Sequence, residues 1–251
     1  MTSQLVLEGG PARVPLRGTY NLRTVGPFPS IHGAIQAERL YRSDALHALD
    51  DAARNALAEL GIRRIVDLRS DAEVAQRPDR LPANVDYVHH PLLLVSPENA
   101  GQEELTLPRL YQRMVEHDGR LLASAVALLS THEGAVLVHC TAGKDRTGLV
   151  VALALLAAGA STDDVITDYA QTEAHLVGEW TQGMLRDLAR AGIAASERLV
   201  QILNGSPAEL MADTIRSIET SHGSAQDYLL DHGLAETDLD ALIAHLTTPR
   251  P

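Results

Sequence analysis

The chain of 251 residues contains one cysteine, Cys140, one phenylalanine and one tryptophan. A single cysteine excludes an intramolecular disulfide and a structural zinc site built from several thiolates. Aromatic residues make up only 3% of the chain and hydrophobic residues 45%, so we expect a sizeable core built from Leu, Ala, Val and Ile. No basic segment followed by an apolar run opens the chain, so the sequence does not predict a secretory signal peptide. We therefore expect a globular cytoplasmic protein.

Basic side chains and long apolar runs are also scarce. Lys and Arg number 21 against 33 Asp and Glu, which gives a net charge of −12. This balance argues against nucleic acid as a partner and against electrostatic docking on anionic membranes. The longest apolar run, 149–158, is about half of the roughly 20 residues of a membrane span, so we expect no stable membrane insertion. An acidic protein that handles phosphate would need a local positive site.

The order of the predicted elements indicates an α/β fold with a helical second half. Residues 1–35 predict short strands and loops, including 4–7. Strand-like runs cover 62–68, 85–94 and 135–139. Helical patterns cover 50–60, 106–117, 120–131, 146–158 and most of 160–251. No linker divides the chain, so we expect a single domain over residues 1–251, with a central sheet flanked by helices and a helical C-terminal part.

Capping-box patterns predict helix starts at 70–73 and at 206–209, the second with proline at the first helical position. The first pattern places Asp67 and Arg69 between the end of strand 62–68 and the following helix. Ligands of α/β proteins bind at this edge of the sheet. We therefore include this turn in the candidate site.

The strongest motif reads HCTAGKDRTG, from His139 to Gly148, and lies between a predicted strand and a predicted helix. In a loop of the form C-x5-R, the backbone amides can converge on one point, and the following helix directs its positive end there. Gly143 permits the sharp turn. Arg146 adds a planar, bidentate donor for phosphate oxygens. Cys140, with its pKa lowered by this environment, would attack phosphorus and form a phosphocysteine without any metal or cofactor.

The motif resembles the signature loop of the protein-tyrosine phosphatase superfamily, HCxxGxxR followed by Ser or Thr. The Gly-Lys-Asp-Arg-Thr-Gly variant resembles a bacterial branch whose members act on phosphotyrosine, phosphoserine or phosphothreonine, and phosphoinositides. Three further segments resemble that branch: 21–23 its NFRD segment, 40–46 its LYRSxxL segment and 66–73 its DLRxxxE segment. Thr24 stands where Asp is usual. The likeness spans roughly residues 20 to 170, and the helical tail fits more loosely.

The resemblance implies a central sheet of the protein-tyrosine-phosphatase kind, and it also implies roles for individual residues. Cys140 is the nucleophile, Arg146 binds phosphate and the transition state, and Thr147 donates its hydroxyl to the leaving thiolate. Lys144 resembles the residue linked to recognition of extra phosphates on inositol rings, although a solvated surface position is an alternative. We expect the phosphate-binding and substrate-binding residues to be Thr141, Ala142, Gly143, Lys144 and Arg42. Arg42 is equally suited to bracing the loop, and we expect His139 to hold the loop by hydrogen bonds.

The general acid is not marked by the usual motif. Tyrosine phosphatases of the eukaryotic type carry it on a Trp-Pro-Asp loop, which this sequence lacks, and Trp180 lies in the helical part. We expect Asp145 to donate the proton, with Asp67 in a supporting or alternative role. A helix cap is the alternative for Asp145, and an ion pair with Arg69 or Arg42 is the alternative for Asp67.

We predict a cysteine-dependent phosphomonoesterase acting on phosphorylated proteins, with phosphoinositides and small phosphates also open as substrates. A catalytically silent phosphate-binding module is the alternative, but such proteins usually lose the Cys or the Arg. Sulfurtransferases generally lack the GxxR ending, and thiol-linked arsenate reductases need extra cysteines. The few aromatic residues favour a shallow, unselective pocket. The oligomeric state stays open.

Two further expectations come from the resemblance. It suggests that helices within 164–190 form a lid over the site. It is also compatible with export without a signal peptide.

Overall fold

The computed structural model describes residues 11–92, 106–130 and 134–248. The predicted piece at 4–7 and the far ends of the segments predicted at 85–94 and 120–131 lie outside these ranges. Within them, five strands form a sheet in the order β1-β4-β7-β5-β6. Their bounds are β1 (Arg23–Thr24), β4 (Leu40–Ser43), β7 (Ala135–His139), β5 (Ile62–Asp67) and β6 (Asp86–His89). Strand β1 is antiparallel to β4, and the other pairs are parallel. The α/β prediction is confirmed.

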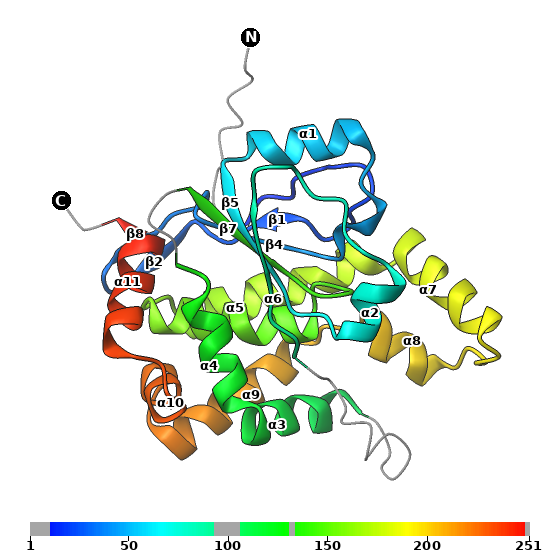
Figure 1. Cartoon of the computed structure of the whole chain (residues 1–251). Helices are drawn as coiled ribbons and strands as arrows, with labels where there is room; N and C mark the ends of the chain where they lie inside the picture. Colours follow the sequence, from blue (N-terminus) through cyan, green and yellow to red (C-terminus); the bar gives the residue numbers. More distant parts are fainter. Residues whose placement is uncertain (1–10, 93–105, 131–133, 249–251) are drawn as a thin grey trace.

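Helices cover both faces of this sheet (Figure 1). One face carries α1 (Asp51–Glu59), which begins at the predicted N-cap Asp50. The other face carries the helices α3 (Leu107–His117), α4 (Gly119–Ala127), α5 (Asp145–Ala157), α6 (Thr162–Leu176), α9 (Ala208–His222), α10 (Ala225–Asp231) and α11 (Glu236–Leu246). Helix α5 lies at the centre of this layer and buries all but one of its 13 residues. It therefore holds its N-terminus in a fixed position beneath the loop that follows β7.

Four short elements gather near the carboxyl ends of β5 and β7. They are η1 (Leu46–Ala48), α2 (Asp71–Gln76), α7 (Glu179–Arg190) and α8 (Glu197–Asn204). Helices α2, α7 and α8 lie together at one side of the molecule in Figure 1. A second sheet of β2 (Phe28–Ser30), β3 (Gly33–Ile35) and β8 (Thr247–Thr248) joins segments far apart in the sequence. None of the helices in the described ranges combines the length and apolar character that crossing a membrane requires.

The two predicted capping boxes have different outcomes. Ser70 accepts from the amide of Glu73, whose carboxylate accepts in return from the amide of Ser70. The second prediction is wrong, because the N-cap of α9 is Pro207. Ser206 instead accepts from the amide of Glu173 at 2.8 Å and bonds α6. The Ser206 hydroxyl therefore forms a tertiary hydrogen bond instead of the helix cap that the local pattern predicted.

Candidate active site

The loop after β7 turns back on itself at Gly143. This glycine has φ 64°, and a Cβ built on it would lie 2.2 Å from the carbonyl oxygen of Ser43. Both the conformation and the close approach require glycine. The backbone amides of residues 141–146 donate no hydrogen bond to any residue that the structure describes. Because they precede the positive end of α5, they can receive an anion.

Cys140 is 2% exposed and lies in a pocket of about 220 Å³ together with Asp145 and Arg146. Burial disfavours the thiolate, but the charge of Arg146 and the polar groups of Thr147 outweigh it. The pKa of Cys140 is therefore lowered. The Thr147 hydroxyl is buried and has no hydrogen-bond partner in the described part of the chain, which leaves it available to the Cys140 sulfur.

Arg146 is held from the turn that follows β5. Its Nη1 and Nη2 donate to the two carboxylate oxygens of Glu73 at 2.7 and 2.8 Å. Glu73 also accepts from the hydroxyl of Thr141. Burial opposes ionisation of this carboxyl, yet these bonds lower its pKa to about 2. The buried Nε of Arg146 has no partner among the described residues, which leaves it for a phosphate oxygen.

Sequence reasoning placed Glu73 in a capping box and in a resembling segment but assigned it no role at the site. The structure makes Glu73 the link between the helix cap at Ser70 and Arg146. The sequence did contain a signal for this role. A capping-box Glu just after a strand lies at the same edge of the sheet as the loop.

The segments around 21–23 and 40–46 brace the loop from behind. Asn21 Nδ2 donates to the carbonyl oxygens of Ala142 and Gly143 at 3.0 and 3.1 Å. Arg42 Nη2 donates to the carbonyl of Gly143 at 2.8 Å, and the Arg42 side chain is fully buried. Of the two expected roles of Arg42, these contacts favour bracing of the loop, and Arg42 is not among the residues that line the Cys140 pocket. Carbonyls held from behind leave the amides of the loop facing the pocket.

Both bracing segments share a counter-ion that sequence reasoning missed. Arg23 and Arg42 each pair with Asp168 on α6, and all three side chains are buried. Burial and the charge of Arg42 lower the pKa of Arg23 to about 9. Burial and the nearby arginines also lower the pKa of His175 to about 4. Two arginines on one carboxylate create a local positive field within an acidic protein. The sequence did contain a signal for this counter-ion. Asp168 lies on the same helix face as Val165, Tyr169 and Thr172, and a carboxylate on such a face needs a partner.

Asp145 faces the pocket and does not cap the helix. The N-cap position of α5 is Lys144, and no side-chain capping bond is formed there. Tyr111 donates its hydroxyl to Oδ1 of Asp145 at 3.1 Å, and its oxygen lies 2.7 Å from the hydroxyl of Tyr169. Both tyrosines are buried. Asp145 is thus oriented by a chain of hydroxyl groups from α3 and α6.

Lys144 is fully buried, so the solvated-surface alternative is wrong. Its Nζ donates to the carbonyl of Ile202 on α8 at 2.6 Å and lies 3.4 Å from Oδ1 of Asp145. In this conformation Lys144 connects the loop to α8. A substrate could meet its ammonium group only after α8 moved.

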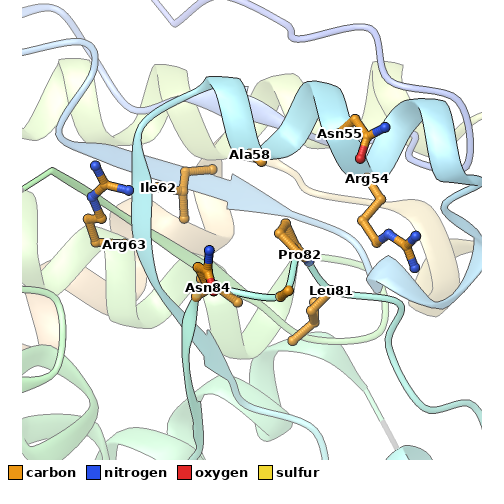
Figure 2. A pocket seen from close by; sticks show the side chains of 10 residues that line it. Arg54, Asn55, Ala58, Ile62, Arg63, Leu81, Pro82 and Asn84 are labelled. Carbon is orange, nitrogen blue, oxygen red and sulfur yellow. The ribbon is translucent and has the colours of Figure 1, made fainter.

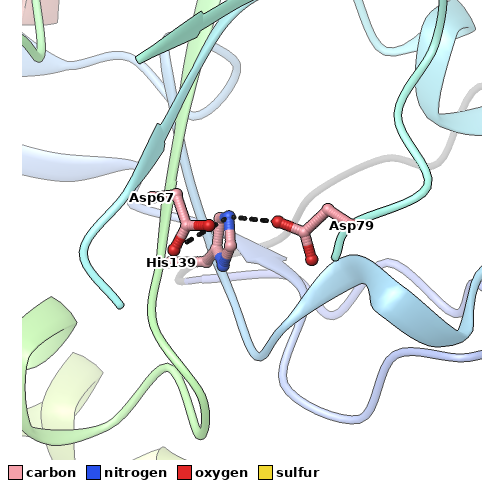
Figure 3. Close-up of side chains that lie close together, drawn as sticks. All are labelled: Asp67, Asp79 and His139. Carbon is pink, nitrogen blue, oxygen red and sulfur yellow. Dashed lines mark ion pairs between the residues drawn. The ribbon is translucent and has the colours of Figure 1, made fainter. Parts of the chain in front are cut away.

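Asp67 lies in a different cluster (Figure 3). It forms an ion pair with Arg69 and accepts from the hydroxyl of Tyr87 at 2.9 Å. Despite its burial, these bonds and His139 lower the pKa of Asp67, so it carries no proton to donate. It is not among the residues that line the Cys140 pocket. The ion-pair alternative therefore describes Asp67, and the structure gives no support to a role as general acid.

His139 joins the same cluster from β7. Its Nδ1 lies 3.4 Å from the carbonyl of Cys140, and its Nε2 lies 3.2 Å from Oδ2 of Asp79. Asp67, Asp79 and His139 are close enough to bind a cation together. However, Arg69 already pairs with both carboxylates at 2.6 Å. Burial opposes the charge on His139, yet Asp79 and Asp67 raise its pKa. The charges are balanced within the protein, and we assign the cluster to structural support of the loop.

The Cys140 pocket is covered, contrary to the expected shallow site. Apolar side chains from α7 and α8 lie over it: Trp180, Met184, Ile202 and Leu203. Trp180 and Leu176 pack with Ala142 of the loop. A separate hollow of about 460 Å³ lies between α1 and residues 81–85 (Figure 2), and none of its lining residues belongs to the loop. The chemistry is thus confined to the covered pocket at the strand ends.

The loop, its bracing residues and its buried thiol form a compact pocket that matches the site expected from the sequence motif. The tyrosine phosphatase family matches residues 14–248, and the chain belongs to this family. It is therefore a phosphoric monoester hydrolase, as the loop motif predicted.

Two curated relatives cover most of the chain. It is 31% identical over 272 residues to the triple specificity protein phosphatase PtpB of Mycobacterium tuberculosis, covering 90% of this chain and 96% of that protein. A tyrosine-protein phosphatase of Nostoc commune is 29% identical over 224 residues, covering 85% of this chain and 76% of that protein.

Proposed function

We propose that the chain hydrolyses phosphorylated side chains of proteins, phosphotyrosine first among them, through a phosphocysteine at Cys140. The observation that carries this proposal is a thiol of lowered pKa beside free loop amides and the free Nε of Arg146. These donors match the oxygens of a phosphoryl group. The names of the two relatives agree with a protein substrate.

The reaction proceeds in two steps. The thiolate of Cys140 attacks phosphorus while the ester P–O bond breaks, and Asp145 gives its proton to the departing oxygen. Asp145 then takes a proton from water, which attacks the phosphocysteine and breaks the S–P bond. Inorganic phosphate leaves, and the Thr147 hydroxyl stabilises the returning thiolate. Arg146 and the amides of 141–146 bind the equatorial oxygens throughout.

Phosphoinositides are a second substrate class that the resemblance favours. The residue implied for their extra phosphates, Lys144, is bonded to Ile202 under α8. We therefore assign phosphoinositide turnover to an opened form, and phosphoprotein turnover needs no free Lys144.

The test is acid-quenched mass spectrometry during turnover of p-nitrophenyl phosphate. The wild-type chain should carry one phosphoryl group on Cys140. Cys140→Ser should lose turnover but still bind inorganic phosphate, because Arg146 and the loop amides remain. Full activity in Cys140→Ser would refute the mechanism. Loss of phosphate binding as well would mean that the loop had collapsed, which a thermal-melting comparison would show.

A further inference from the structure

A second cavity of about 430 Å³ lies beside the covered pocket. The two hollows share Glu73, Thr141, Trp180 and Met184 in their walls. The remaining wall of the second cavity comes from η1, the end of α2 and one face of α7, together with Gly18, Tyr20, Asp44, Ala45 and Arg69. No step of the phosphoryl transfer uses this space. Because it adjoins the site of the thiol, the part of a substrate beyond the scissile ester can extend into it.

One cation in this cavity is unpaired. Arg186 on α7 lines the cavity and is exposed, and it forms no ion pair or hydrogen bond with any residue in the described ranges. The other two arginines there are engaged. Arg77 pairs with Asp187, and Arg69 pairs with Asp67 and Asp79. Arg186 is thus the guanidinium in this cavity that can accept a new anionic partner.

The other lining residues restrict what that anion can be. Glu73, Glu179 and Asp187 also face the cavity, so several phosphate groups would meet strong repulsion. Apolar groups from Trp180 and Met184 supply a surface for a peptide chain. A single carboxylate next to an apolar segment matches this combination better than a polyphosphorylated ring.

We propose that this cavity is a specificity subsite for an acidic residue adjacent to the phosphorylated residue of a protein substrate, recognised by Arg186. The proposal rests on the phosphatase function proposed above. Exposed ion pairs are weak, so we expect a selectivity of a few fold.

The experiment compares kcat/KM for pairs of phosphotyrosine peptides. The two peptides of a pair differ only in carrying Glu or Ala next to the phosphotyrosine, on its N-terminal side in one pair and on its C-terminal side in the other. The wild type should prefer the Glu peptide on one side. Arg186→Gln should lower the Glu/Ala ratio about twofold to fivefold. Glu179→Gln should raise the ratio, because it removes a repelling carboxylate. The control is Arg120→Gln, which removes the same charge from an exposed position on α4 outside the cavity and should leave the ratio unchanged.

Three outcomes would overturn the subsite. The wild type could show no preference for Glu, Arg120→Gln could lower the ratio as much as Arg186→Gln, or Arg186→Gln could instead abolish a preference for inositol bisphosphate over monophosphate. In each of these cases the phosphatase function would stand. Absence of turnover of both peptides and of p-nitrophenyl phosphate by the wild type would overturn the function and the subsite together.

Discussion

At the scale of a single residue, Asp145 has two tasks in the proposed mechanism: it gives a proton to the leaving oxygen and later takes one from water. The Tyr111 hydroxyl at 3.1 Å and Lys144 Nζ at 3.4 Å hold its carboxyl group in position. Asp145 also lines the Cys140 pocket, so its proton can reach the oxygen of a substrate bound there.

Replacing Asp145 by Asn should therefore slow the reaction according to its leaving group. We expect kcat for phenyl phosphate, which has a poor leaving group, to fall about 10²- to 10⁴-fold. The loss for p-nitrophenyl phosphate should be much smaller, because p-nitrophenolate departs without a proton. Steady-state kinetics on a series of aryl phosphates measures the difference. Asp240→Asn, the same change on an exposed part of α11, is the control. Equal losses on both substrates would assign Asp145 to structure instead.

At the scale of the elements, the segment 164–190 that was expected to form a lid consists of two helices that are packed very differently. Helix α6 is anchored, since Asp168 pairs with two buried arginines and Tyr169 is 1% exposed. Helices α7 and α8 are lightly packed, and only Trp180, Thr181 and Asn204 are buried on them. Arg77 on the edge of α2 pairs with Asp187 of α7. We propose that the mobile cover is 179–204 and that 164–176 stays fixed.

Hydrogen exchange should locate this cover. With inorganic phosphate at ten times its Kd, exchange of amides in 179–204 that open only in the free form should slow about tenfold. Amides of α6 within 164–176 should exchange at the same rate in both states. Arg77→Gln should speed exchange of α7 without phosphate, because the ion pair to Asp187 is lost. Identical protection of 179–204 with and without phosphate would contradict the proposal.

At the scale of the whole molecule, the cluster beneath the loop joins three parallel strands. It links His139 at the end of β7, Asp67 at the end of β5, and Tyr87 on β6, with Arg69 and Asp79 closing the network. The pKa of His139 is raised above its ordinary value of 6.5 in the folded chain. A raised pKa means that the stabilisation is complete below pH 6.5 and is lost as the pH rises through the folded value.

Replacing Asp79 by Asn should reveal this dependence of folding stability on pH. Removing one partner of a buried ion pair costs about 3–5 kcal/mol, so we expect a loss of that size below pH 6.5. The gap to wild type should narrow at higher pH, where His139 loses its proton in both proteins. Urea unfolding across the pH range measures it. Asp213→Asn breaks an exposed ion pair with Arg216 and should change little at any pH. A pH-independent gap would show that His139 is not the titrating partner.

The arrangement of charges over the whole molecule explains how an acidic chain can contain a positive site. A net charge of −12 would repel phosphate, yet Arg23, Arg42 and Arg146 converge behind and within one loop. Their counter-ions, Asp168 and Glu73, are buried or partly buried, so the positive field is strongest where the amides point. Local arrangement, and not overall composition, makes the anion site.

The sequence by itself determined the parts that depend on local chemistry. The order β-loop-α around Cys140, the glycine at 143 and the capping box at Ser70 follow from neighbouring residues, because a strand, a sharp turn and a helix start are specified over a few positions. Cys140 and Arg146 could be singled out as the candidate nucleophile and phosphate-binding residue for the same reason.

Only the tertiary structure decided which distant groups meet. It paired Asp67 with Arg69 away from the Cys140 pocket, placed Arg42 behind the loop, and buried Lys144 beneath α8. It also brought Asp168 and Tyr111 to the site from helices far along the chain. A charged side chain near a phosphate loop can bind substrate or brace the backbone, and packing fixes the choice because a buried charge must stay with its partner.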